Sequence, residues 1–233
     1  MAKGILYGVG VGPGDPELLT LKAVRILRES DIIAVPDKGT GRKIAMSIAG
    51  EIIGSKELLY CPTPMIKDRQ KLDTCYDRIA LDICSLLSEG KQVAFITLGD
   101  PSIYSTYIYV HSRVLERGFT AEMVPGVTSF CAAAAKLNMS LCKGAERLLI
   151  VPAGHGSDDT MDVRANKVFM KAGNAIGELI GKLSEGRLLE KTSMVVNCGM
   201  DGESVFTNLA EAEVAAGAAE APGYFAIVVT RED

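Results

Sequence analysis

Short apolar runs alternate with amphipathic stretches along the first half of the chain. The runs are too short for buried helices and are bounded by glycine, proline and aspartate, so they predict strands. The expected strands are Ile5–Tyr7, Asp31–Val35, Leu58–Tyr60, Gln92–Leu98 and Ala121–Val124. The expected helices are Glu17–Leu27, Ile44–Ile53, Asp68–Glu89, Ile103–Arg117 and a small-residue helix through Ala132–Ala135. Apolar strands that alternate with helices predict an α/β fold with an open parallel sheet.

The first turn, Gly8-Val9-Gly10-Val11-Gly12-Pro13-Gly14-Asp15-Pro16, joins the first expected strand to the first helix. Asp15 suits an N-cap, and Pro16 suits the first helical position. The turn is not a dinucleotide fingerprint, because Pro13 and Asp15 stand where that pattern needs its last glycine, and it lacks the Gly-Lys-Ser/Thr of a P-loop. A tight turn without a ligand stays open as an alternative.

Two further strands are followed by similar turns. Gly99-Asp100-Pro101-Ser102 follows the fourth strand, and Pro125-Gly126-Val127-Thr128-Ser129 follows the fifth. Ligands of open parallel sheets gather beyond the carboxyl ends of the strands, so we expect the two Gly-Asp-Pro turns side by side there. Asp100 is either an N-cap or a ligand-binding carboxylate, and Thr128 and Ser129 are either helix caps or ligand contacts.

A positively charged loop follows the second strand. Lys38, Arg42 and Lys43 lie among glycines, on the sheet edge where the Gly-Asp-Pro turns are expected. This loop is either a solvated surface segment or a lid that meets an anionic substrate.

Composition narrows the class of protein. The 233 residues suffice for one large or two ordinary domains, and a net charge of −4 gives no general basic field for nucleic acid. We expect no membrane span and no leader peptide, since no apolar run is long enough and no charged-then-apolar segment precedes the first strand. The six cysteines form no C-x-x-C pair. They are expected to be reduced, mostly buried residues of a cytoplasmic protein, without a metal site.

Together the motifs identify a resemblance. Gly-x-Gly-Pro-Gly-Asp-Pro followed by Leu-Leu-Thr-Leu-Lys-Ala, then Gly-Asp-Pro, then Val-Pro-Gly-Val-Thr-Ser, resembles the tetrapyrrole (corrin/porphyrin) methyltransferase family over nearly the whole chain. These enzymes use S-adenosylmethionine. The run Gly99–Thr106 is most similar to the branch that methylates C20 of precorrin-2 or cobalt-factor II.

The resemblance implies two α/β domains with a cofactor cleft between them, and a homodimer. We place the domains at 1–118 and 119–233, with the hinge near Gly118. In the second, Arg147–Val151, Lys167–Met170, Ser193–Cys198 and Tyr224–Thr230 are expected strands. Helices are expected near Ala175–Ser184 and Leu209–Ala219.

The resemblance also implies a set of cofactor-binding positions, most of them in the three turns. They are Pro13, Leu98, Gly99, Asp100, Ile103, Thr128, Ser129, Met170 and Gly199. Met170 matches a methionine that packs on adenine, although a buried strand methionine is the alternative. Substrate-binding candidates are Lys38, Arg42, Lys43 and Tyr104.

No catalytic base is transferred. Sirohaem-type relatives carry an acid just after the second strand, where this chain has Pro36 followed by Asp37. Methyl transfer from a sulfonium needs mainly in-line geometry in a dry site. Tyr104, Tyr107, Asp37 or water are candidates for removing the C20 proton afterwards. Of the two histidines, His111 is expected to be structural, and His155, in a polar glycine loop, stays unassigned.

Three other functions remain open. The chain is an alternative candidate for methylating another tetrapyrrole position within the same family. A conventional glycine-loop methyltransferase would use Gly8, Gly10 and Gly12, with Asp37 on the ribose. A non-enzymatic α/β ligand-binding protein would bind without turnover.

Overall fold

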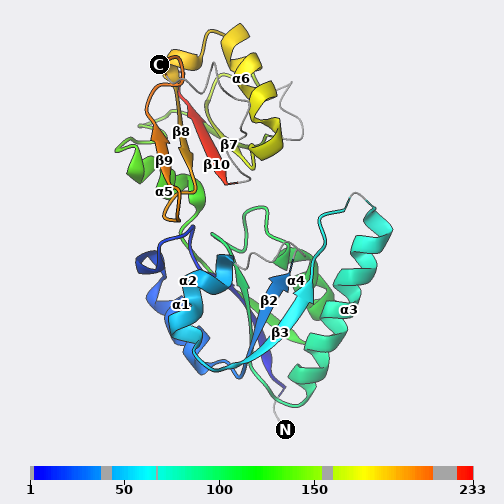
Figure 1. Cartoon of the computed structure of the whole chain (residues 1–233). Coiled ribbons are helices and arrows are strands. Elements are labelled where there is room, and N and C mark those ends of the chain that lie inside the picture. Colours follow the sequence, from blue (N-terminus) through cyan, green and yellow to red (C-terminus); the bar gives the residue numbers. More distant parts are fainter. Residues whose placement is uncertain (1–2, 38–43, 67, 154–159, 212–224, 233) are drawn as a thin grey trace. The chain divides into compact units, whose positions relative to one another are not determined.

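The computed structural model describes residues 3–37, 44–66, 68–153, 160–211 and 225–232, except the side chain of Asn174. The chain divides into two compact units, Met1–Thr128 and Ser129–Asp233, each with its own sheet. Figure 1 shows the elements of each unit. Two α/β units confirm the expected fold class.

The sheet of the first unit has the strand order β3-β2-β4-β1-β5. Its strands are β1 (Ile5–Gly10), β2 (Ile32–Asp37), β3 (Glu57–Pro62), β4 (Val93–Thr97) and β5 (Thr120–Val124). Every pairing is parallel, as the apolar runs predict. All five strands therefore end at one edge of the sheet, and the turns that follow them collect there.

Alternate residues of the central strands enter two different hydrophobic cores. Val93 and Phe95 pack with α3 (Arg69–Ser88) and α4 (Tyr107–Glu116) on one face. Ala94 and Ile96 pack with α1 (Leu21–Glu29) and α2 (Ile44–Ile53) on the other. Helices on both faces explain why these strands read as unbroken apolar runs.

The first helix begins later than its apolar spacing predicts. Asp15 does cap a helical turn, accepting from Glu17 N at 2.8 Å, but this is a short 3₁₀ turn, Pro16–Leu18. The chain is extended at Thr20, whose Oγ1 accepts from Ala23 N and so caps α1. Two consecutive caps split the expected helix into two pieces.

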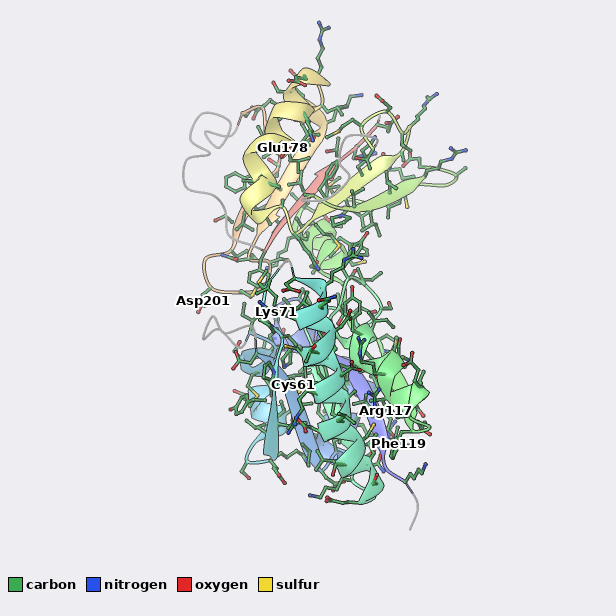
Figure 2. All side chains as sticks on the ribbon, turned by 90° about the vertical axis from the view of Figure 1, so that its right-hand side faces the viewer. Cys61, Lys71, Arg117, Phe119, Glu178 and Asp201 are labelled. Carbon is green, nitrogen blue, oxygen red and sulfur yellow. The ribbon has the colours of Figure 1, made fainter. Side chains whose placement is uncertain are left out.

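Helices α3 and α4 are joined by charged and aromatic contacts. Arg113 bonds Asp73 and Asp77 at 2.8 and 3.0 Å, and Arg117, which follows α4, bonds Asp77 at 3.2 Å. Figure 2 shows α3 from the side, with Lys71 in its first turn and Arg117 labelled beside it. These ion pairs hold the second half of α4 against α3.

The division between the units falls after Thr128 rather than near Gly118. Strand β5 pairs with β1 from Ile5↔Thr120 to Val9↔Val124, so it completes the first sheet. Gly118 itself, at φ +75°, closes the turn between α4 and β5.

The second unit begins with α5 (Ser129–Lys136), and its sheet has the order β6-β7-β10-β8-β9. The strands are β6 (Leu148–Pro152), β7 (Asn166–Met170), β8 (Thr192–Val196), β9 (Ser204–Phe206) and β10 (Ala226–Thr230). The helix α6 (Ile176–Glu185) packs on this sheet, and α5 lies against β8 and β10. Short 3₁₀ turns, Gly173–Ala175 and Leu189–Lys191, precede α6 and β8.

The sheet of the second unit is mixed. Strands β6 and β7 are parallel, whereas β10 is antiparallel to both β7 and β8. Consequently β7 and β8 point the same way and end at one edge. The short β9 was not expected, and residues 209–211 form a turn where a helix was expected, while 212–219 lie outside the described residues.

The cysteines are less buried than expected. None forms a disulfide, and Cys61, Cys84 and Cys198 are buried, but Cys131 and Cys142 are exposed. In the described part of the chain, no helix is long and apolar enough to cross a lipid bilayer.

We predict that Gly8→Ala strongly destabilises the first unit. A Cβ at Gly8 would lie 2.1 Å from Cε1 of Tyr107, whose ring is fully buried and cannot withdraw. Overpacking of this kind costs about 1–3 kcal/mol or more. Gly50→Ala in α2 is the matched control, because its Cβ would meet nothing within 4 Å, and it should be neutral or stabilising by up to about 1 kcal/mol. Equal urea midpoints for the two variants would contradict this packing.

Candidate functional site

Three turns meet at the carboxyl edge of the first sheet, after the adjacent strands β4, β1 and β5. The first and second are joined by main-chain hydrogen bonds: Gly99 N donates to Gly12 O at 2.8 Å, and Gly12 N to Gly99 O at 3.3 Å. Both glycines have positive φ, +79° and +71°, which few other residues adopt. The expected juxtaposition of the two Gly-Asp-Pro turns is therefore present.

The third turn packs against the other two without intervening side chains. A Cβ on Gly126 would lie 2.2 Å from Gly99 O, and one on Gly10 would lie 2.6 Å from the same oxygen. Gly10 therefore lacks a side chain because another main chain fills the space. The space beside Gly8 is likewise filled, by Tyr107.

This packing argues against the conventional glycine-loop methyltransferase. That alternative needs Gly8 and Gly10 open to a ligand, and needs Asp37 beside the first turn. Asp37 does end β2, but β4 stands between β2 and β1 in the sheet. In addition, the backbone O of Asp37 accepts a hydrogen bond from Thr63 N at 2.7 Å. Thr63 follows β3, which lies on the other side of β2 from β4 and β1.

Asp100 ties the second turn to the third. Its Oδ1 accepts from the backbone N of Ser102 at 2.8 Å and from the Ser102 hydroxyl, and its Oδ2 accepts from Gly126 N at 3.0 Å. Of the two alternatives for Asp100, the helix N-cap is wrong, because α4 begins only at Tyr107. A carboxylate has about four acceptor positions, so one on Oδ2 is left for a ligand.

Thr128 carries a polar atom that the described protein leaves unused. Its Oγ1 is buried and has no hydrogen-bond partner among the described residues, so it does not cap α5. A buried hydroxyl without a partner costs about 1–3 kcal/mol. It is therefore a natural contact for a bound polar molecule. Ser129, the other member of the expected pair, is the first residue of α5.

The apolar candidates lie in the same turns. Pro13 is buried, whereas Leu98 and Ile103 are half-buried. Leu98 packs against the core formed by α1 and α2. The first unit thus collects Pro13, Leu98, Gly99, Asp100, Ile103 and Thr128 at one sheet edge.

Met170 and Gly199 lie at the corresponding edge of the second sheet. Met170 ends β7 and is buried. Burial fits both alternatives for this residue, a methionine that packs on adenine and a structural methionine of the strand. Gly199 lies in the turn after β8 at φ +73°, and its N donates to the Glu203 carboxylate at 2.6 Å. Glu203 in turn pairs with Lys136 of α5 at 3.0 Å.

Glu203 orders the Gly199 turn, a role that no motif in the sequence indicates. The hydrogen bond from Gly199 N, followed by the bond from Lys136, lowers the pKa of the Glu203 carboxyl below its ordinary value. Glu203 lies four positions after Gly199, whereas Lys136 comes from a helix far away in the sequence, so only the fold brings the three together.

Tyr107 is removed from the candidate proton acceptors. It is fully buried, donates to Glu122 O at 2.9 Å and lies 3.0 Å from His111 Nδ1. Burial raises the pKa of Tyr107 and lowers that of His111. Both residues are structural, as expected for His111, while Tyr104 remains 45% exposed in the second turn.

Several candidates lie outside the described residues: Lys38, Arg42, Lys43 and His155. Within the described ranges, no three His, Cys, Asp or Glu side chains are grouped so as to hold a metal ion.

Comparison with known proteins identifies the family. The family described as Tetrapyrrole (Corrin/Porphyrin) Methylases matches residues 5–213, so this chain belongs to it. The resemblance read from the three turns is confirmed, and with it S-adenosylmethionine as the cofactor of the family.

Three relatives act on one ring position according to their names. The chain is 41% identical to a probable cobalt-precorrin-2 C(20)-methyltransferase of Methanocaldococcus jannaschii, over 72% of this chain and 73% of that protein. It is 32% identical to the cobalt-precorrin-2 C(20)-methyltransferase of Salmonella typhimurium, over 89% of this chain and 90% of that protein. It is 30% identical to a precorrin-2 C(20)-methyltransferase of Sinorhizobium, over 89% of each chain.

Solved structures share the fold. A cobalt precorrin-4 methyltransferase matches with a TM-score of 0.76 at 20% identity, over 97% of this chain and 94% of that one. Uroporphyrin-III C-methyltransferase from Thermus thermophilus, complexed with S-adenosyl homocysteine, matches with a TM-score of 0.70 at 24% identity, over 98% of each.

We predict that Glu203→Gln destabilises the protein only above acidic pH. The lowered pKa means that the Glu203 carboxylate stabilises the fold above its unfolded pKa, and that this contribution disappears as pH falls through the folded pKa. The expected loss is about 1 kcal/mol at pH 7, and urea unfolding at pH 7 and pH 3 measures it.

Glu178→Gln is the control. Glu178 lies on α6, as Figure 2 shows, and makes an ion pair with Lys182 of the same helix. Such pairs contribute about 0.5 kcal/mol or less. If Glu203→Gln lowers the free energy of unfolding by the same amount at pH 3 as at pH 7, the charge of Glu203 is not what holds the Gly199 turn.

Proposed function

We propose that this protein is an S-adenosylmethionine-dependent methyltransferase that adds a methyl group to C20 of precorrin-2 or its cobalt-bearing form in cobalamin biosynthesis. The observation that carries the proposal is the agreement of relatives from three organisms on this ring position, at 41, 32 and 30% identity. Membership of the methylase family supports the chemistry independently.

The reaction requires placement more than side-chain chemistry. S-adenosylmethionine supplies an activated methyl group, and the electron-rich C20 forms a bond to it as the carbon–sulfur bond breaks. S-adenosylhomocysteine leaves, and the C20 proton is then lost to a base or to water. With Tyr107 buried, Asp37, Tyr104 and water remain as acceptors, and we assign none. The protein must hold both reactants in line and keep bulk water away.

We propose that the first-unit turns hold the cofactor through Gly99, the free acceptor position of Asp100 and the Thr128 hydroxyl. Pro13, Leu98 and Ile103 add apolar contact. The support is that Thr128 Oγ1 is buried without a partner in the described chain and that Asp100 has one unused acceptor position. Ser129, Met170 and Gly199 are proposed as the contribution of the second unit, on the strength of the motif match.

The substrate is a polyanion because precorrin-2 carries acetate and propionate side chains. We propose that Lys38, Arg42 and Lys43 meet these carboxylates, since this basic segment directly follows β2 in the sequence. Neutralising all three should raise KM for the tetrapyrrole mainly at low ionic strength, because salt screens exposed charges. A KM that is unchanged at low salt would assign them to a solvated surface.

We further propose a cytoplasmic homodimer without nucleic-acid or membrane partners. Six free cysteines support a reducing compartment, and a net charge of −4 opposes nucleic-acid binding. The dimer rests on the family resemblance, and light scattering of the purified protein tests it.

Incubation with methyl-labelled S-adenosylmethionine tests the proposed activity. We expect one methyl group to be added to precorrin-2 or its cobalt form, with the label located at C20 by NMR. A label on another ring carbon would assign the chain to a different position within the family. Binding of both ligands without turnover would support the non-enzymatic alternative instead.

We predict that Thr128→Val weakens S-adenosylmethionine binding about tenfold without lowering the melting temperature. Valine keeps the shape of threonine, and Oγ1 has no partner among the described residues, so its removal leaves no described group unpaired. Isothermal calorimetry and thermal unfolding measure the two effects.

Thr192→Val is the matched control. Thr192 is also buried, but its hydroxyl bonds Leu188 O at 2.7 Å and Thr230 Oγ1 at 2.9 Å. Its valine variant should lose stability and keep cofactor affinity. If Thr128→Val instead behaves like Thr192→Val, the Thr128 hydroxyl serves the fold and not the cofactor.

A further inference from the structure

Among the residues that the structure describes, five non-glycine residues have a left-handed backbone, and their positions fall into two groups. Asn138 and Arg187 follow the ends of α5 and α6, where such a conformation ends many helices. Tyr104, Lys171 and Asn197 follow β4, β7 and β8, at the sheet edges that carry the candidate site residues. Among these three, Tyr104 is the one aromatic residue, with φ +48°.

The turn around Tyr104 is fixed on both sides. Before it, the Asp100 carboxylate accepts from the N and hydroxyl of Ser102. After it, Ser105 Oγ lies 2.8 Å from Thr97 Oγ1 and accepts from Tyr107 N at 3.1 Å. The backbone at Tyr104 thus has little room to relax to a more common conformation.

Glycine would avoid the cost of this conformation. A left-handed non-glycine residue costs of the order of 1–3 kcal/mol, and such residues cluster at functional sites. Burial of the ring offsets only part of that cost, because Tyr104 is 45% exposed. Tyr107, three residues later, has an ordinary helical backbone and is fully buried. Packing in the core therefore explains why residue 107 is aromatic, but it explains only in part why residue 104 is.

The position of the turn suggests what the ring contacts. β4 lies between β2 and β1, so the turn that carries Tyr104 leaves the sheet from the middle of its carboxyl edge. A reduced tetrapyrrole presents a broad, largely apolar ring face. Aromatic side chains contact such faces by offset stacking, worth about 0.5–1.5 kcal/mol beyond the area buried.

We propose that Tyr104 is a substrate-positioning residue, held in a strained, fixed turn so that its ring lies against the face of the tetrapyrrole macrocycle. This rests on the proposed function for the identity of the substrate. The rigid turn keeps the ring in place before the substrate arrives, so little ordering remains to be done on binding.

Two matched pairs of variants test the proposal: Tyr104→Ala with Tyr104→Gly, and Arg187→Ala with Arg187→Gly. Arg187 has a similar φ, +54°, and lies exposed after α6. In each pair the glycine variant should melt about 2–4 °C higher than the alanine variant, because only glycine fits the backbone without strain. Both Tyr104 variants should raise KM for precorrin-2 about tenfold, which corresponds to roughly 1.4 kcal/mol.

Two further measurements separate a binding role from a structural one. The affinity for S-adenosylmethionine should stay within about twofold in every variant, and Tyr104→Phe should keep the KM for precorrin-2, because the ring is retained. Both Arg187 variants should keep both ligand constants. Affinity for the fluorescent, oxidised ring of precorrin-2, measured by anisotropy, should fall with Tyr104→Ala in parallel with the rise in KM.

The outcomes distinguish this proposal from the proposed function. Normal turnover with an unchanged KM in Tyr104→Ala overturns the role of Tyr104 and leaves the activity standing. A loss in Tyr104→Phe as large as in Tyr104→Ala also overturns it, because the hydroxyl would then be what matters. Tetrapyrrole binding that depends on Tyr104 but is never followed by methyl transfer overturns the activity alone. Absence of tetrapyrrole binding by the unaltered protein overturns both.

Discussion

Main-chain contact among Gly10, Gly99 and Gly126 is the constraint on which the candidate site depends. Without side chains between them, the turns after β1, β4 and β5 reach one another directly, and hydrogen bonds between Gly12 and Gly99 fix two of them. Asp100 joins the third by accepting from Gly126 N. The glycines therefore serve contact within the protein, and the atoms that we propose for ligand binding are those that this contact leaves unused.

Each sheet edge has a fixed backbone at its turns. In the first unit, the Thr128 hydroxyl has no partner among the described residues, and Tyr104 is only partly buried. In the second, Glu203 occupies Gly199 N and so orders the turn after β8. Methyl transfer suits such an arrangement, because it relies on two reactants being held in line more than on proton transfer within the protein. Residues that order the turns are therefore as important here as residues that touch a ligand.

The sequence predicted the first sheet well because its signals are local. Each strand is a short apolar run that ends at a turn marked by glycine or proline, and the three glycine turns carry the residues that resemble the family. The sequence did not predict where β4 is inserted, between β2 and β1, and this strand order is what removes Asp37 from the first turn. The roles of Asp100, Tyr107 and Glu203 were missed or misread for a similar reason. Their partners, Gly126, Glu122 and Lys136, are distant in the chain, so only the fold defines those contacts.

The central claim is that the joined turns at the carboxyl edge of the first sheet form the cofactor site. Amide hydrogen exchange with and without S-adenosylhomocysteine tests it most directly. We expect slower exchange at 98–104 and 125–129, with further protection near Met170 and Gly199, and no change at the opposite edge of the first sheet, at 29–32 and 90–93. Protection confined to that opposite edge, or absent from the turns after β4 and β5 at saturating ligand, would contradict the account.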